Sequence, residues 1–244
     1  MHLRQGHLTA SLCLAVLVGA ITWLPSVAGG TALRASAPST AGASSEPTLQ
    51  VGSSGAAVTL LQQKLTALHY WVGTTDGYFG DSTEQAVWAL QKAAGLPRDG
   101  AVGSQTWAAL FRGVVPIPRP AKGYTIEVNL QNDLVMFVRN NQLEWTLNTS
   151  TGGGYTYCEY GSGCAVAETP VGHFHIYKEV DGLVTDPLGQ LWRPKFFDVG
   201  FALHGDSYVP PVPVSHGCVR VSNEAIDWIW GANLAPVGTA FWVF

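Results

Sequence analysis

The sequence predicts a multi-domain α plus β protein, with a small three-helix bundle followed by a β-sandwich-like domain. Apolar residues recur at helical spacing in residues 49–112, whereas in residues 123–244 they mostly alternate with polar ones. Residues 113–122 lie between the two patterns and contain three prolines, so we expect a short, semi-stiff linker there. Several short strands separated by turn residues favour a sandwich or barrel for the second domain.

The composition excludes two broad classes of protein. Hydrophobic residues make up 47% of the 244 residues, which is enough apolar surface for a folded core and excludes wholesale disorder. Charged residues make up 12%, and the formal net charge is −4. A protein that binds nucleic acid through a basic patch needs a local excess of Lys and Arg, so no nucleic-acid partner is expected.

The start of the chain predicts a targeting segment. Residues 8–24 are apolar, and Ser26 and Ala28 supply small residues at −3 and −1 of a cleavage site. We therefore expect residues 1–28 to be a signal peptide and the mature protein to be secreted and extracytoplasmic. The alternative is an uncleaved membrane anchor, because the apolar run is near the shortest length that spans a bilayer. Residues 29–48, rich in Ser, Ala, Gly and Thr, predict a flexible linker.

Three helices are expected in the first domain. Apolar residues at helical spacing predict one over residues 56–68. A second should start at Asp81, an N-cap candidate followed by Glu84 three residues later. A third should run over residues 104–111.

An internal repeat accompanies these helices. The pattern D-G-x-x-G-x-x-T occurs at residues 76–83 and again at residues 99–106. With the Leu-Gln-Gln-Lys-Leu run at residues 61–65, it makes residues 49–112 resemble the peptidoglycan-binding domain type 1 family. The resemblance implies a module that binds the wall glycan and has no chemistry of its own. The alternative is an unrelated helical domain that serves as a spacer.

In the second domain the apolar period changes to two. Alternating runs predict strands over residues 125–130, 134–139, 143–148 and 173–177. A helix is expected over residues 223–230, close to the end of the chain.

The cysteines differ in expected state. Cleavage of a signal peptide leaves Cys158, Cys164 and Cys218, and three thiols in an oxidising compartment leave one unpaired. Cys158 and Cys164 flank a short turn-like segment and form the natural local disulfide. Cys218 is then a free thiol in a His- and Ser-rich context, which indicates a functional cysteine.

A nucleophilic cysteine needs a base to accept its proton. His216 is close in sequence, but residues i and i+2 on an extended strand lie about 6.6 Å apart along the chain. His204 ends an apolar run, and the proline-containing loop of residues 206–214 can bring it beside Cys218. We therefore expect His204 to be the base.

These residues belong to a recognisable pattern. Residues 123–244 resemble the L,D-transpeptidase catalytic domain, the YkuD family, in which a histidine precedes a Ser/Thr-His-Gly-Cys motif. The matching segments here are His204, Ser215-His216-Gly217-Cys218, Ser150-Thr151-Gly152 and Thr169-Pro170-Val171-Gly172.

The resemblance implies roles for the catalytic residues. Cys218 is the nucleophile and His204 the general base, whose ring is oriented by the carbonyl of Gly205. Backbone N–H groups around His216, Gly217 and Cys218 are implied to form the oxyanion hole.

Three further residues are expected to contact substrate. Arg220 stands where some family members have Asn, and its planar fork suits a substrate carboxylate. Ser215 is a second expected contact, and Tyr155 a third. Tyr155, with Tyr157 and Tyr160, can also form a lid over the site.

The resemblance implies a peptidoglycan L,D-transpeptidase that works without a cofactor. Through a cysteine thioester it forms 3→3 cross-links between stem peptides, in cell-wall biogenesis and the control of cell shape, and carbapenem-type inhibitors acylate it. One alternative is an L,D-carboxypeptidase that trims tetrapeptide stems. Another is a non-catalytic wall-binding protein.

No metal site is expected from the sequence. His204, His216 and Cys218 are all zinc-ligand types, but the sequence shows no fourth ligand. His173 and His175 share one face of a strand, where an exposed polar face accounts for them better than a metal.

Overall fold

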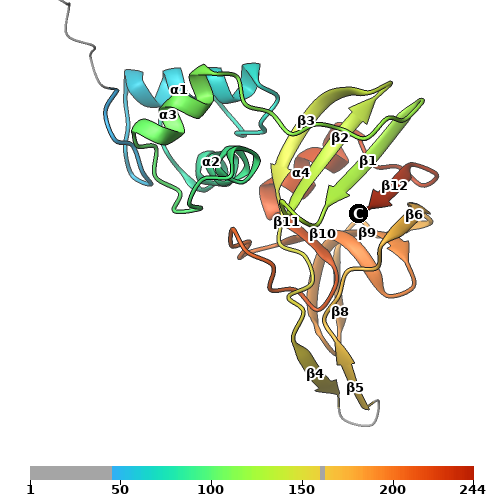
Figure 1. Cartoon of the computed structure of the whole chain (residues 1–244). Coiled ribbons are helices and arrows are strands. Elements are labelled where there is room, and N and C mark those ends of the chain that lie inside the picture. The colour runs from blue at the N-terminus through green and yellow to red at the C-terminus, as the bar shows by residue number, and fades with distance from the viewer. Residues whose placement is uncertain (1–45, 160–162) are drawn as a thin grey trace, which may run out of the picture. The chain divides into compact units, whose positions relative to one another are not determined.

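A computed structural model describes residues 46–159 and 163–244, and all of these residues belong to one structural unit (Figure 1). The predicted signal peptide and most of the predicted flexible linker lie outside the described residues, as does Tyr160. Within the described ranges no helix is long and apolar enough to cross a membrane.

Among the described elements, the first three helices precede the strands and the fourth lies between the last two strands, in agreement with the predicted mixed fold (Figure 1). The described helices are α1 (Ala56–Ala67), α2 (Asp81–Ala94), α3 (Ser104–Phe111) and α4 (Asn223–Gly231). The described strands are β1 (Tyr124–Asn129), β2 (Leu134–Arg139), β3 (Gln142–Asn148), β4 (Thr156–Glu159), β5 (Gly163–Val166), β6 (Gly172–His175), β7 (Lys178–Glu179), β8 (Leu183–Asp186), β9 (Gly189–Asp198), β10 (Phe201–Asp206), β11 (Val219–Ser222) and β12 (Ala240–Val243).

The helix α2 corrects one expectation about its start. Its N-cap is Gly80 and no side chain caps it, so Asp81 is the first helical residue instead of the cap. Asp81 and Glu84 both lie in the first turn, where negative charge interacts favourably with the helix dipole.

The internal repeat is explained by two buried glutamines. The Gln62 side-chain amide donates to Asp76 and accepts from the Gly77 backbone N–H at 2.9 Å each. The Gln91 amide does the same with Asp99 at 2.7 Å and with the next glycine N–H at 3.0 Å. Each glutamine therefore satisfies one Asp-Gly turn, and α1, α2 and α3 share one apolar cluster around them.

Two mixed sheets make up most of the second half of the chain. One has the strand order β3-β2-β1-β12-β6 and the other the order β11-β10-β9-β7, with β8 paired to β9. The pairs β1–β12 and β10–β11 are parallel, which the pattern of short strands separated by turn residues did not indicate. Both sheets contribute to one buried apolar cluster.

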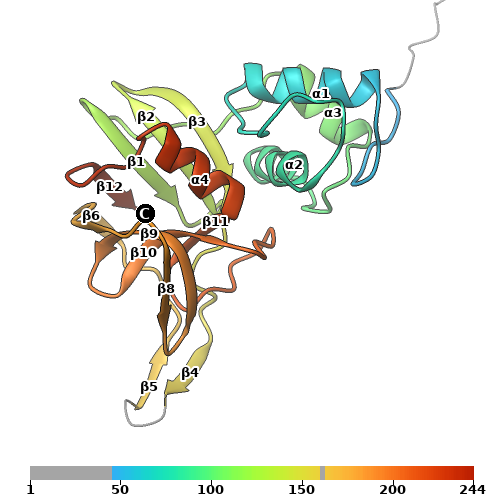
Figure 2. The same cartoon turned by 180° about the vertical axis from the view of Figure 1, so that it is seen from behind.

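The helix α4 connects the two sheets and matches the predicted helix closely. Ser222 caps it by accepting the N–H of Ala225, and the helix contacts β9, β10 and β11 (Figure 2). Its Trp228 packs edge-on against Phe137 of β2 and Trp145 of β3.

The helical region and the sheets each contribute one buried side chain to the apolar cluster of the other. Trp71, from the loop after α1, lies in the apolar cluster of the sheets and contacts Trp228 at a centroid distance of 5.6 Å. Leu134 of β2 is buried in the cluster of the helices. The backbone N–H of Trp71 also donates to the Thr146 carbonyl of β3 at 3.1 Å. The helical region is therefore packed against the sheets, in addition to being joined through residues 113–122.

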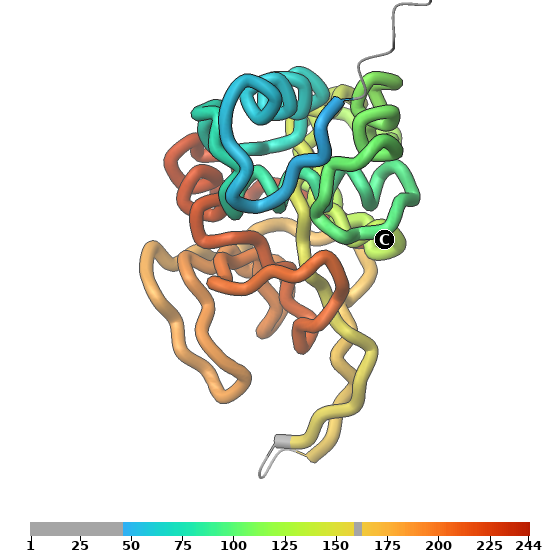
Figure 3. The backbone as a smooth tube through the Cα atoms, turned by 90° about the vertical axis from the view of Figure 1, so that its left-hand side faces the viewer, coloured from blue at the N-terminus to red at the C-terminus, as the bar shows by residue number. Residues whose placement is uncertain are grey.

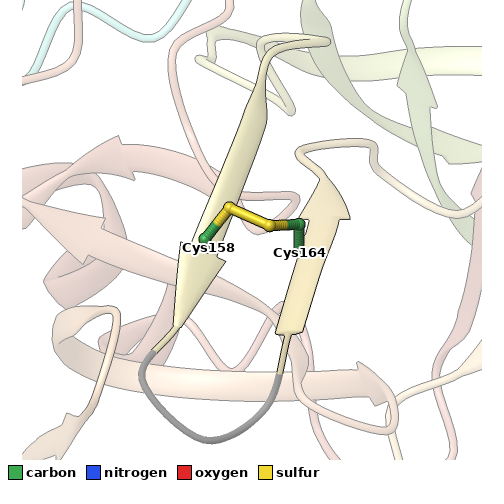
Figure 4. Close-up of a disulfide and its surroundings, with 2 residues drawn as sticks. All are labelled: Cys158 and Cys164. Carbon is green, nitrogen blue, oxygen red and sulfur yellow. A yellow bond between two sulfur atoms is a disulfide. The ribbon is translucent and has the colours of Figure 1, made fainter.

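Two hairpins extend from the same side of the sheets (Figure 3). One is formed by β8 and β9, and the other by β4 and β5. In the second hairpin Cys158 pairs with Cys164 across the strands, and a disulfide joins them (Figure 4).

We predict that non-reducing peptide mapping of the purified protein finds Cys158 bonded to Cys164 and Cys218 as a free thiol. Replacing both hairpin cysteines by serine should lower the free energy of unfolding by at most about 2–3 kcal/mol, because the loop they close is short. A mapped disulfide that contains Cys218 would contradict this assignment.

Candidate active site

A cavity of about 310 Å³ lies where β10 and β11 meet the β8–β9 hairpin. Its lining includes Cys218, His204, His216 and Arg220, four residues expected from the sequence. The parallel pairing of β10 with β11 brings them together, because Leu203 lies opposite Val219 and His204 lies opposite Arg220.

The turn that carries Cys218 is built around a buried hydroxyl. Ser215 is fully buried, and its hydroxyl donates to the Cys218 carbonyl at 2.6 Å. The same oxygen accepts the Gly217 N–H at 3.0 Å. Ser215 was expected to contact substrate. Because it is buried and makes these two hydrogen bonds within the turn, it stabilises the turn instead.

Gly217 has a backbone conformation that other residues rarely adopt, with φ of 133°. A Cβ there would collide with the ring of Phe201 and would approach the Glu168 carbonyl oxygen to 2.6 Å. Because the Gly217 N–H already donates to Ser215, it is not free for an oxyanion, contrary to the sequence-based expectation. The N–H groups of His216 and Cys218 remain as candidates for that role.

His204 is buried, with 3% of its surface exposed, and its ring is held by its neighbour. Its Nδ1 lies 2.8 Å from the Gly205 carbonyl oxygen. A carbonyl can only accept, so Nδ1 carries the proton and Nε2 is left as an acceptor. Burial lowers the pKa of His204, although the Gly205 hydrogen bond acts in the opposite direction. The ring is therefore neutral at neutral pH.

Cys218 is the free cysteine of the described residues. Burial raises the pKa of its thiol to about 11, and a backbone hydrogen bond from Ala202 opposes that shift. The thiol points to the Gly200 carbonyl oxygen at 3.8 Å. A protonated thiol and a neutral imidazole are thus the resting states, instead of a preformed thiolate, and the proton must move when the sulfur reacts.

His216 lies between two tyrosines. Its ring packs edge-on against Tyr157 at 4.7 Å and against Tyr155 at 5.6 Å, measured between centroids. Tyr157 lines the cavity, whereas the Tyr155 hydroxyl donates to the Val214 carbonyl at 3.2 Å. Of these two tyrosines only Tyr157 lines the cavity. Tyr155, which was expected to contact substrate, instead hydrogen-bonds to the loop beside the cavity.

Arg220 is paired with an acidic residue that the sequence analysis missed. Its Nε lies 3.3 Å from the Asp206 carboxylate, but it makes no hydrogen bond in the structure. The guanidinium is therefore held near Asp206 by an ion pair, and both residues line the cavity.

Other lining residues come from segments to which the sequence analysis assigned no role. Asp186 and Leu188–Leu191 of the β8–β9 hairpin and Val199–Phe201 complete the cavity. Thr169 acts behind it, because its hydroxyl donates to the Gly217 carbonyl at 2.8 Å and accepts the Gly152 N–H at 2.9 Å. The Thr-Pro-Val-Gly motif marked Thr169 in the sequence, but no pattern linked the hairpin tip to Cys218.

The two histidines of β6 have no metal site around them within the described ranges. Among the described residues, no group of three or more His, Cys, Asp or Glu side chains is arranged to hold a metal ion. His173 stacks on Trp242 of β12 at a centroid distance of 4.4 Å, and His175 is exposed on the same strand.

Comparison with known proteins agrees with both domain types. The family model of the peptidoglycan binding domain matches residues 54–110, and that of the L,D-transpeptidase catalytic domain matches residues 123–243. The crystal structure of an L,D-transpeptidase from Xylanimonas cellulosilytica DSM 15894 is 44% identical, with a TM-score of 0.77 over 80% of this chain and 97% of that one. The chain therefore belongs to the L,D-transpeptidase family.

Two further relatives are more distant or cover less. The L,D-transpeptidase (Yku) from Stackebrandtia nassauensis is 21% identical, with a TM-score of 0.45 over 80% of this chain and 94% of that one. The "Uncharacterized protein in bpoA1 3'region" of Kitasatospora aureofaciens is 44% identical over 78 residues. That match covers 30% of this chain and 66% of the relative's length.

We predict that Gly217→Ala lowers the free energy of unfolding by about 2 kcal/mol or more, because the added methyl group meets backbone and ring atoms. The matched control is Gly231→Ala at the end of α4, where a Cβ meets no atom within 4 Å. The control should change stability by less than about 0.5 kcal/mol. Urea unfolding monitored by tryptophan fluorescence gives both values, and equal losses in the two variants would refute the steric argument.

Proposed function

We propose that the protein is a secreted, wall-associated L,D-transpeptidase that forms 3→3 cross-links between peptidoglycan stem peptides through a thioester at Cys218. One observation carries the proposal. Cys218 and His204 line the same cavity, and the Gly205 carbonyl holds the His204 ring in the tautomer that can accept a proton at Nε2.

The proposed acylation step starts from the neutral pair. His204 Nε2 accepts the thiol proton while the sulfur attacks the carbonyl carbon of the L,D peptide bond in a donor tetrapeptide stem. The N–H groups of His216 and Cys218 stabilise the oxyanion. The C–N bond then breaks, the imidazolium returns the proton to the leaving D-Ala amine, and a thioester remains on Cys218.

The second step transfers the acyl group. A side-chain amine of a neighbouring stem attacks the thioester carbonyl, and His204 takes the amine proton and returns it to the thiolate as the C–S bond breaks. If water reacts instead, the same site is a carboxypeptidase. The chemistry on this chain's side is identical in the two cases, so the products distinguish them.

Two further parts of the chain support substrate binding. The helical region is the proposed glycan-binding module of the enzyme. Arg220 is the proposed contact for a substrate carboxylate, because its guanidinium lines the cavity that also holds Cys218. Carbapenem-type inhibitors are proposed to acylate Cys218 at their strained lactam carbonyl.

We predict that the rate of Cys218 acylation by a carbapenem rises with pH through the lowered pKa of His204 and levels off near neutral pH. The rate rises with pH because only the neutral imidazole can accept the thiol proton. The neutral form predominates above the pKa of His204. His204→Ala should lower the rate at pH 7 by about 10²-fold or more. The remaining rate should keep rising beyond pH 9, because it then follows ionisation of a thiol whose pKa is raised to about 11.

Intact-mass spectrometry at a series of pH values measures these rates. Cys218→Ser is the control for adduct formation at other residues. His216→Ala should leave the midpoint of the pH profile unchanged, since its ring packs on Tyr157. A profile that shifts in His216→Ala and stays in place in His204→Ala would reverse the assignment of the two histidines.

The proposed activity is tested by incubating the protein with purified disaccharide-tetrapeptides and analysing the products by mass. Cross-linked dimers are expected, and Cys218→Ser should form none. Arg220→Gln should raise KM for the stem more than it lowers kcat. Tripeptide monomers alone would replace the transpeptidase by a carboxypeptidase, and unchanged substrate would refute both.

A further inference from the structure

The buried ammonium of Lys92 links α2 to the sheets. The Lys92 side chain has no exposed surface. Its Nζ donates to the Asp133 carbonyl oxygen at 2.8 Å, to the Asp133 carboxylate at 3.1 Å and to the Thr149 carbonyl oxygen at 2.8 Å. An ammonium has three N–H donors, so each is used, and all three acceptors belong to the catalytic domain. Burial lowers the pKa of Lys92 to about 8, which leaves it charged at neutral pH.

Asp133, the partner of Lys92, also binds the segment that follows β3. Asp133 is buried in the turn between β1 and β2, in a left-handed conformation with φ of 56°. Its second carboxylate oxygen accepts the Thr151 N–H at 3.1 Å and the Thr151 hydroxyl at 2.8 Å. One carboxylate therefore connects the ammonium of α2 to the segment that follows β3.

That segment, residues 149–153, holds both ends of the turn that carries Cys218. On one side Ser150 and Arg220 exchange backbone hydrogen bonds of 3.2 and 3.0 Å, and the Thr149 hydroxyl donates to the Arg220 carbonyl at 2.7 Å. On the other side the Ser215 N–H donates to the Thr151 carbonyl at 2.9 Å. Ser215 and Arg220 flank Cys218 three residues before it and two residues after it.

We propose that Lys92 is a positioning residue for Cys218, so that the helical region is part of the catalytic unit in addition to its proposed wall-binding role. The inference rests on the proposed role of Cys218 as the nucleophile, but not on which amine or water accepts the acyl group. Lys92 fixes the Asp133 turn and Thr149, these fix residues 149–153, and that segment sets the position of the sulfur relative to His204.

A purely structural role predicts something different. A buried ion pair is often replaceable by neutral residues without loss of stability, whereas removing one partner leaves an uncompensated charge. Stability should therefore fall in Lys92→Met and recover when Asp133→Asn removes the second charge. If Lys92 only stabilises the fold, the acylation rate recovers with it. If Lys92 positions the thiol, the rate stays low, because the Thr149 and Asp133 carbonyls still lack their donor.

The experiment compares the full-length protein with Lys92→Met, Asp133→Asn and the double variant. Lys64→Met is the matched control, because Lys64 lies on α1 and its ammonium lies over the exposed Phe111 ring. Thermal unfolding followed by circular dichroism reports stability. Intact-mass kinetics with a carbapenem report the acylation rate and its pH dependence, well below every unfolding temperature.

We expect Lys92→Met and the double variant to acylate about tenfold more slowly or worse, since small displacements of reacting groups cost factors of up to about 10². Their pH profiles should move to higher pH as the sulfur loses its alignment with His204. The double variant should nevertheless unfold at a higher temperature than Lys92→Met, and Lys64→Met should match the wild type in rate and pH profile.

Several results would overturn the inference. These are a double variant that regains the wild-type rate, a folded Lys92→Met within twofold of the wild type, or failure of both Lys92 variants to fold. The last would make Lys92 a determinant of folding as a whole. A wild-type protein that is acylated but forms no cross-links would refute the proposed function. The acylation rates of the variants would still test the role of Lys92.

Discussion

The site depends on the backbone hydrogen bonds between residues 149–153 and the turn that carries Cys218. Cys218 lies in a turn between β10 and β11 that has little regular structure of its own, and the backbone of this segment holds the turn at Ser215 and at Arg220. Inside the turn, the Ser215 hydroxyl satisfies one carbonyl and one N–H. The geometry around Cys218 is therefore set by buried hydrogen bonds from a segment distant in sequence, and only glycine fits at position 217.

Burial then determines the electrostatics of the pair. A thiol and an imidazole removed from water both favour their neutral forms, which is the direction of both pKa shifts here. In the proposed mechanism, charge is created only when the sulfur attacks the substrate.

Much of this arrangement could be predicted from the sequence, because local patterns mark α1, α3, α4 and the first three strands. The long strand β9 could not be predicted in this way. It contains Pro194, which lacks an N–H, and Arg193 in a left-handed conformation, so its pattern is irregular although it lies inside a sheet. Likewise, no local pattern reveals that the β8–β9 hairpin brings Asp186 to the cavity, since that depends on long-range strand pairing. The buried state of Lys92 is equally non-local, because a lysine on a helix is normally exposed.

Because each half contributes a buried side chain to the other's core, the two halves are coupled in unfolding. Trp71 completes the apolar cluster of the sheets, and Leu134 completes that of the helices. Melting either half uncovers part of the other's interior, so the two halves share one cooperative transition instead of two independent ones. If the backbone were cut within residues 113–122, the two halves would accordingly stay associated. The catalytic half expressed alone would expose apolar surface that the helical half normally covers, which favours self-association.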